Sequence, residues 1–264
     1  MINKSDYRSP ADLKTRAQVA LTGRFGPAVI VTLSYFIWLY LISYSGTIIS
    51  AIISRLPFFS GLNISIPAQI IFTVISTLIA AMLSIIGEMF VCGLDLYYLN
   101  ISTGRDATNG DIFAGFRDNP SETFKIAAFL LLPSIILSLP YNILADLYIL
   151  TKIKECMYAS TAFLVLALIA SLYMHLTYGI AFFLKLDFPT YSASKILKLT
   201  RQKMTGHRKR LFALDIRFIP MLILCILSLG VGMLWVYPII TEAHTLFFLN
   251  LMNPGHYIPI DERI

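Results

Sequence analysis

The longest uncharged apolar run is the feature that most restricts how this chain can fold. Residues Ala28 to Ser54 contain no charged side chain. About 20 apolar residues in a helix are enough to cross the hydrocarbon of a bilayer, and a helix pairs its own backbone polar groups there. The run therefore predicts a transmembrane helix.

Five further apolar stretches have a comparable character. They cover residues 68–99, 124–145, 157–184, 211–229 and 233–252. Pro133 and Pro140 lie in the second of these and predict kinks, which membrane helices tolerate. We therefore expect an all-α, polytopic integral membrane protein with about six transmembrane helices arranged as three hairpins. Residues 233–252 are the least apolar, and a helix lying flat on the outer membrane surface is the alternative for them.

The composition favours a membrane protein over a soluble one. Of the 264 residues, 57% are hydrophobic and 14% are charged, whereas about a quarter of a soluble domain is charged. The net charge is +6, but the basic residues flank apolar runs. This placement indicates a bilayer with anionic headgroups as the partner and argues against nucleic acid. The cysteines, Cys92, Cys156 and Cys225, form no CxxC pair, so no metal site and no cofactor is predicted.

The distribution of lysine and arginine predicts the orientation. The connections before the first run, around residues 100–125 and 185–210, and after the last run hold 17 of these residues, against 3 in the connections at 55–67 and 146–156. Cytoplasmic connections carry the excess of basic residues. Both termini are therefore expected in the cytoplasm, with the chain in the cell membrane.

A short polar segment before each predicted hairpin is interpreted as a cytoplasmic, interfacial amphipathic helix. In the first, Ser9 can cap the helix, Pro10 suits its first position and Asp12 completes a capping box. In the third, a helix starting near Pro189 and Thr190 is expected to turn one side to lipid, namely Ile196, Leu197, Thr200 and Met204. Its basic side chains are expected to bind lipid headgroups: Lys195, Lys198, Arg201, Lys203, Arg208, Lys209 and Arg210.

Three similar strings predict an internal repeat. Residues 96–101, 181–186 and 246–251 read LYYLNI, AFFLKL and LFFLNL, and each closes an apolar run. Residues 22–24, 114–116 and 205–207 each place a glycine just before a run. We expect one transmembrane domain over residues 1–264 with pseudo-repeats at about 9–101, 109–186 and 190–252, followed by a tail at 253–264. Chance likeness between apolar sequences is the alternative.

Charged or titratable side chains within the apolar runs are the candidates for a functional site, because burying them in lipid is costly. They are Glu88, Asp95, His175, Asp215, Arg217, Glu242 and His244. A lone acid such as Glu88 either binds a proton or cation or is hydrogen-bonded to a neighbouring helix. Asp215 and Arg217 point to different sides of their helix, and Arg217 is expected to meet Glu88 or Glu242.

Two strings near the C-terminus resemble a known family. Residues 199–218, LTRQKMTGHRKRLFALDIRF, and residues 229–238, LGVGMLWVYP, are similar to the signature of the bacterial membrane proteins catalogued as domain of unknown function 975. Arg217 and the order Tyr237-Pro238 depart from the expected pattern. The resemblance covers nearly the whole chain and implies a multi-pass membrane protein, but no activity.

Two functions are compatible with these features. A transport-related or permease-like protein is favoured by the repeat and the acids within the spans. A non-enzymatic scaffold or accessory subunit that organises lipid or a partner complex is the alternative. Phosphate-binding loops, nucleophile elbows and HExxH motifs are missing, so no enzyme is predicted. The partner is the bilayer, with a second membrane protein or a homo-oligomer left open.

Overall fold

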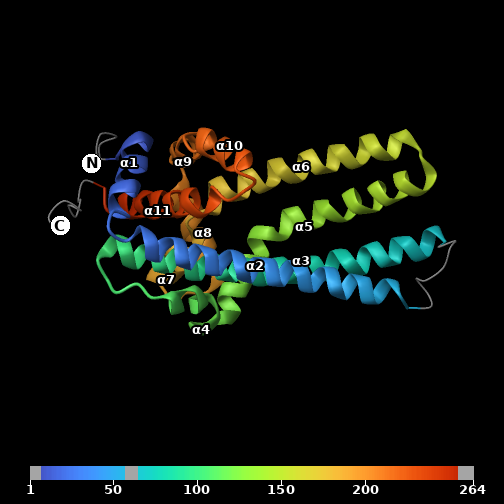
Figure 1. The fold of residues 1–264 in the computed structure, drawn as a ribbon, viewed down its shortest axis with the longest axis horizontal. Helices are drawn as coiled ribbons and strands as arrows, with labels where there is room; N and C mark the ends of the chain where they lie inside the picture. The colour runs from blue at the N-terminus through green and yellow to red at the C-terminus, as the bar shows by residue number, and fades with distance from the viewer. Residues whose placement is uncertain (1–6, 57–64, 255–264) are drawn as a thin grey trace. The chain divides into compact units, whose positions relative to one another are not determined.

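The computed structural model describes residues 7–56 and 65–254, and the regular structure within these residues is helical (Figure 1). The helices are α1 (Pro10–Ala20), α2 (Phe25–Ser54), α3 (Ile66–Thr103), the 3-10 helix η2 (Asn109–Phe113), α4 (Ala114–Arg117), α5 (Pro120–Thr151), α6 (Lys154–Tyr178), α7 (Ala181–Asp187), α8 (Ala193–Met204), α9 (Arg208–Ile216), α10 (Ile219–Leu227) and α11 (Met233–Met252). The predicted all-α class is confirmed. The predicted tail lies outside the described residues from position 255 onward.

Four helices are long and apolar enough to cross a membrane. They are α2, α3, α5 and the segment Lys154–Asp187, which joins α6 and α7. The first four predicted spans thus correspond to helices that could cross a membrane, and the predicted multi-pass character is confirmed. Their helices are longer than predicted, and the connection expected at residues 146–156 shrinks to Lys152 and Ile153 between α5 and α6.

The predicted fifth span is not one helix. The backbone amides of Arg217 and Phe218 bond the carbonyls of Leu214 and Asp215, three residues back. An α-helix pairs each amide with the carbonyl four residues back, so its hydrogen-bond pattern is interrupted there. Pro220, in the first turn of α10, has no amide hydrogen to restore it. The segment is therefore divided into α9 and α10, of nine residues each.

The chain forms two compact units. Unit 1 comprises the described residues of Met1–Phe36, Phe90–Thr123 and Leu176–Ile264, and unit 2 those of Ile37–Met89 and Phe124–His175. Neither the single-domain prediction nor the internal repeat is tested by this division, and both stay predictions.

Unit 2 is held together by the close approach of α2 to α3 and by hydrogen bonds between polar side chains of α3 and α5. A Cβ atom at Gly46 of α2 would lie 2.8 Å from a methyl carbon of Leu83 on α3, so the missing side chain lets these helices approach. Between α3 and α5, Asn142 donates to Thr77 at 3.2 Å and Gln69 donates to Asp146 at 3.3 Å. These side-chain bonds join α3 and α5 within their largely apolar segments.

Unit 1 is built around α11. Helix α1 packs along α11 and against α9. Leu13 and Ala17 of α1 are buried, as is Leu21 directly after it. The Phe248 ring of α11 stacks on Phe183 of α7, with ring centroids 5.0 Å apart. Figure 1 shows α11 running beneath α1 and α9 toward the C-terminus.

Two of the capping features predicted for α1 are present, whereas the Asp12 carboxylate that was expected to complete a capping box bonds Arg8 and Arg16. The Ser9 hydroxyl accepts from the Asp12 amide at 3.2 Å, and Pro10 is the first residue of the helix. Burial alone raises the pKa of Asp12, but hydrogen bonds from Arg8 and Arg16 outweigh it and hold the pKa below its ordinary value.

The interpretation of α8 needs a correction. Ile196, Thr200 and Met204 were expected to face lipid, but they are fully buried inside the protein, where α7 packs against α8. Amphipathic periodicity identifies an apolar side, but protein and lipid cover such a side equally well. The start of α8 is also held by protein, because the Ala193 amide donates to the Glu122 carboxylate at 2.5 Å.

Gly93 on α3 provides a test of this packing. A Cβ atom there would lie 2.0 Å from the carbonyl oxygen of Ile112 in η2, so Gly93→Ala must push backbone apart. We expect it to lower the free energy of unfolding by about 1–3 kcal/mol, measured by thermal unfolding of the purified protein. Gly26→Ala in α2, where the added atom meets nothing within 4 Å, is the control and should be neutral or stabilising. Equal losses in both variants would contradict the packing.

Candidate functional site

Glu242, at the centre of α11, is the most unusual titratable residue of unit 1. Its side chain is 0% exposed. Ser102 of α3 donates its hydroxyl hydrogen to Oε1 at 2.5 Å, whereas Oε2 is buried without a hydrogen-bond partner among the described residues. An ionised carboxylate buried with one hydrogen bond is costly. Binding of a proton at Oε2 would remove this cost, although the positive charge of Arg24 also acts on the carboxylate.

The polar residues next to Glu242 on α11 do not supply a partner for Oε2. The Thr241 hydroxyl donates to the Tyr237 carbonyl at 3.1 Å, and the Thr245 hydroxyl donates to the Thr241 carbonyl at 2.9 Å. Both hydroxyl hydrogens are therefore used on their own helix. On α3, Tyr98 is one turn before Ser102, and its hydroxyl is bonded to Thr32 at 3.0 Å. Among the described residues, Ser102 is the side chain that hydrogen-bonds Glu242.

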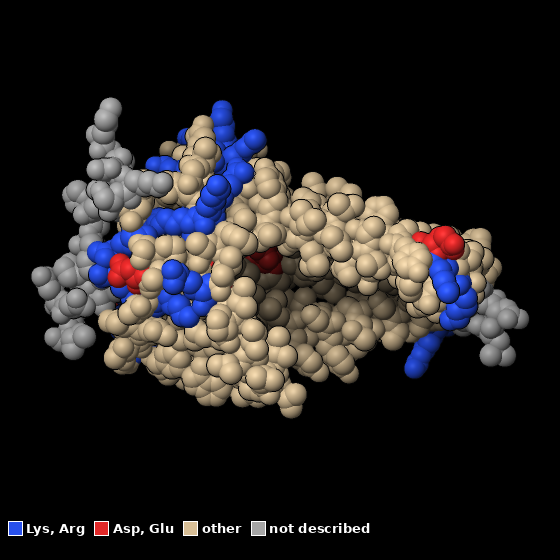
Figure 2. All heavy atoms as spheres, turned by 90° about the horizontal axis from the view of Figure 1, so that it is seen from above, with Lys and Arg blue, Asp and Glu red and all other residues tan. Residues whose placement is uncertain are grey.

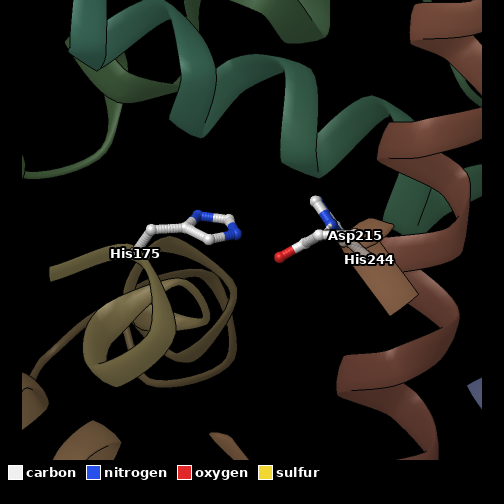
Figure 3. A group of neighbouring side chains, drawn as sticks. All are labelled: His175, Asp215 and His244. Carbon is white, nitrogen blue, oxygen red and sulfur yellow. Dashed lines mark hydrogen bonds and ion pairs between the residues drawn. The ribbon is translucent and has the colours of Figure 1, made fainter. Parts of the chain in front are cut away.

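Asp215 and His244 form a second polar pair in unit 1. The His244 Nε2 atom lies 2.7 Å from Asp215 Oδ1, joining α11 to α9 (Figure 3). Because His244 follows Glu242 by two positions, the two side chains leave α11 on nearly opposite sides. The pair therefore stabilises the packing of α9 on α11 and is separate from the Glu242 carboxyl.

The other predicted site residues belong to several different helices. Asp95 is buried in α3 within unit 1, whereas Glu88 of α3 and His175 of α6 belong to unit 2. The Arg217 side chain is exposed at the end of α9. The predicted pair of Arg217 with Glu242 does not form, because Glu242 is enclosed and takes its hydrogen bond from Ser102. The Arg217 carbonyl instead accepts from Lys14 Nζ at 2.8 Å.

Arg210 is used inside the protein. Its Nε donates to the Arg8 carbonyl at 2.9 Å, another guanidinium nitrogen bonds the Asn250 side chain, and the guanidinium lies 4.8 Å from the ring centroid of Phe247. The Arg8 amide also donates to Asn250 at 3.0 Å. Burial lowers the pKa of Arg210 to about 10, so the group stays charged at neutral pH. This clamp, Arg210 with Arg8 and Asn250, fastens the start of α1 to α9 and α11.

Most of the predicted headgroup-binding side chains face outward. Lys195, Lys198, Arg201, Lys203 and Lys209 are exposed, and Arg208 is half-buried like Arg210. The Lys195 ammonium lies over the Tyr191 ring, 3.3 Å from its centroid. In the view of Figure 2, basic atoms gather over α1 and α9. Binding of these side chains to lipid stays a prediction.

The sequence reasoning missed Asp146 as a half-buried polar group of unit 2. Asp146 was assigned to a connection, but it lies in α5 and accepts hydrogen bonds from Thr73 and Gln69 of α3. The signal was the spacing of Gln69, Thr73 and Thr77, which recur every four residues and so share one side of α3. Within an apolar run, such a stripe indicates contact with another polar helix rather than with lipid.

The clamp can be tested by matched substitutions of neighbouring basic residues. Arg210→Gln removes buried, charge-assisted hydrogen bonds and should lower the free energy of unfolding by about 2 kcal/mol. Lys209→Gln removes the same charge from an exposed position and should change it by less than about 0.5 kcal/mol. Thermal unfolding in detergent measures both, and similar losses would show that Arg210 acts only through net charge.

Comparisons with known proteins place this architecture in a family. No curated protein and no solved structure matches the chain. The family described as protein of unknown function (DUF975) matches residues 7–254, nearly the whole chain. The resemblance noted in the strings at 199–218 and 229–238 is thereby confirmed. The chain, a multi-pass protein with four candidate membrane-spanning helices, belongs to the DUF975 family.

Proposed function

We propose that this protein has a transport-related function in which the Glu242 carboxyl of unit 1 binds and releases a proton. The observation that carries the proposal is the unpartnered oxygen Oε2 of a fully enclosed acid. A buried acid with a structural role has its oxygens hydrogen-bonded in most proteins. A polar atom left without a partner marks a place where a ligand can add one.

A proton fits the site better than a metal cation does. Hard cations are held by several oxygen ligands at once, whereas the hydroxyls of Thr241 and Thr245 on α11 donate to their own helix. A proton needs one oxygen, and it removes the charge whose burial is costly. Ser102 can serve both forms of the acid, because its hydroxyl donates to Oε1 in either state.

The orientation of the chain is part of the proposal. The excess of lysine and arginine in the terminal segments and in residues 185–210 supports cytoplasmic termini and a location in the cell membrane. The exposed basic side chains of α8 support contact with anionic headgroups. We assign no enzymatic step to the protein.

A scaffold or accessory role is the second candidate. It is favoured by the same exposed basic residues of α8, which would also suit docking of an acidic partner. The two functions differ in what they require of Glu242: a docking surface does not need an acid enclosed in the core of unit 1.

Proton movement into liposomes tests the proposal. The protein is reconstituted with a pH-sensitive dye inside the vesicles, and a potassium diffusion potential drives protons inward. Wild-type protein should acidify the interior faster than protein-free vesicles do. Glu242→Gln keeps the size and the bond to Ser102 but cannot exchange a proton, so its rate should fall to that of protein-free vesicles.

Glu88→Gln is the matched control, because it removes an acid from α3 in unit 2 and should retain the wild-type rate. Thermal unfolding of each variant shows that it is folded. Wild-type rates in folded Glu242→Gln would contradict the proposal. Wild-type protein that moves no more protons than empty vesicles would also contradict it and favour the scaffold.

A further inference from the structure

The hairpin between α10 and α11 presents an apolar tip to its surroundings. Leu229 is 95% exposed and Leu227 is 75% exposed. Five further apolar side chains of this hairpin are more than half exposed or at that limit: Ile223, Leu224, Ile226, Val231 and Trp235. Exposed apolar patches of this kind mark contact with a partner or with a membrane.

The tip carries no charge that would hold it in water. Between Arg217 and Glu242, 24 consecutive residues lack any charged side chain. A turn at an aqueous surface ordinarily contains polar residues, whereas this turn reads Ser-Leu-Gly-Val-Gly at residues 228–232.

The backbone of the tip satisfies its own hydrogen bonds. The amides of residues 228 to 235 all donate within the hairpin; the Gly230 amide, for example, bonds the Cys225 carbonyl at 2.8 Å, and the Gly232 amide bonds the Ser228 hydroxyl at 2.8 Å. Leu229 and Gly230 adopt positive φ angles of 54° and 87° to close the turn. Complete internal pairing of amides is what hydrocarbon demands and water does not.

The base of the hairpin lies beside the polar helix α1. Lys14 of α1 bonds the Arg217 carbonyl, where α10 is about to begin, at 2.8 Å. At the far end of α11, Asn250 accepts from the Arg8 amide, just before α1. Between Arg217 and the turn, α10 offers nine residues, or about 14 Å of helix. The hydrocarbon core is roughly 30 Å thick, so α10 is too short to cross it.

We propose that residues 218–241 form a re-entrant hairpin that enters the hydrocarbon from the side of the membrane on which α1 lies and turns back within it. The partner of the exposed tip is the acyl chains of the bilayer. A second protein is a less suitable cover, because the tip has neither charges nor unpaired amides to specify one. The hairpin takes the place of the fifth and sixth spans expected from the sequence and keeps both ends of the segment on one side.

Depth-dependent fluorescence quenching tests the proposal on the full-length protein. The chain has two tryptophans, so Trp38→Phe leaves Trp235 near the tip as the single reporter. The variant is reconstituted into vesicles of lipids brominated either near the headgroup or near the methyl end of the acyl chain. The re-entrant hairpin predicts stronger quenching by the deep bromines. Stronger quenching by the shallow bromines would place Trp235 at a surface and overturn the proposal.

Thiol labelling separates the remaining topologies. Leu229→Cys, on a background in which Cys92, Cys156 and Cys225 are replaced by alanine, is treated with a membrane-impermeant maleimide from each side of oriented vesicles. We expect labelling from neither side, and full labelling after denaturation in detergent. Asp106→Cys and Lys152→Cys, in two exposed connections, are the controls for the two sides. Labelling of position 229 from the Lys152 side would indicate a full crossing, and labelling from the Asp106 side would indicate a surface turn; either result overturns the proposal. This test is independent of the role of Glu242.

Discussion

The enclosure of α11 by protein is the constraint on which unit 1 depends. This helix carries Glu242, His244 and two buried threonines, and a helix with such groups cannot turn them toward hydrocarbon without a large cost. The surrounding helices lower that cost without removing it: Ser102 of α3 bonds one oxygen of the acid, Asp215 of α9 pairs with the histidine, and α1 packs along the helix. Helix α1 is therefore one of the helices that enclose α11.

The hydrogen-bond partners of the polar groups also differ between the two ends of α11. Toward its C-terminus, Asn250 bonds Arg210 and the Arg8 amide, which fastens the helix to its neighbours. Toward its N-terminus, the turn at residues 228–232 has uncharged side chains and paired amides. A hairpin that enters lipid needs a polar base fastened to its neighbours and an apolar tip whose backbone amides are hydrogen-bonded within the hairpin. The two ends thus suit two environments.

The parts of the fold set by local sequence were predictable. Length and hydropathy identified the four long helices, and Ser9, Pro10 and Asp12 identified the start of α1. The apolar side of α8 was also found, but whether protein or lipid covers it depends on α7, which periodicity does not describe. The break between α9 and α10 had a local signal in Pro220, which was outweighed by the apolar run around it.

The candidate site was predictable only as a set of residues. Glu242 stood out because acids are rare in apolar runs, whereas its partner Ser102 is 140 positions away and ordinary in composition. Asp146 was missed because its helix extends further than hydropathy suggested, through bonds to α3. Hydrogen bonds of this kind are formed by tertiary packing. A single sequence therefore identifies the unusual acids but not the side chains that bond them.

Hydrogen–deuterium exchange of the protein in lipid nanodiscs tests the central claim, that α11 is the enclosed core helix of unit 1. Peptides covering residues 241–251 should exchange far more slowly than the exposed connection at residues 104–107, because their amides are helical and their side chains are buried. Exchange of residues 241–251 at the rate of that connection would show that α11 lies at the surface of the protein, and would contradict the account.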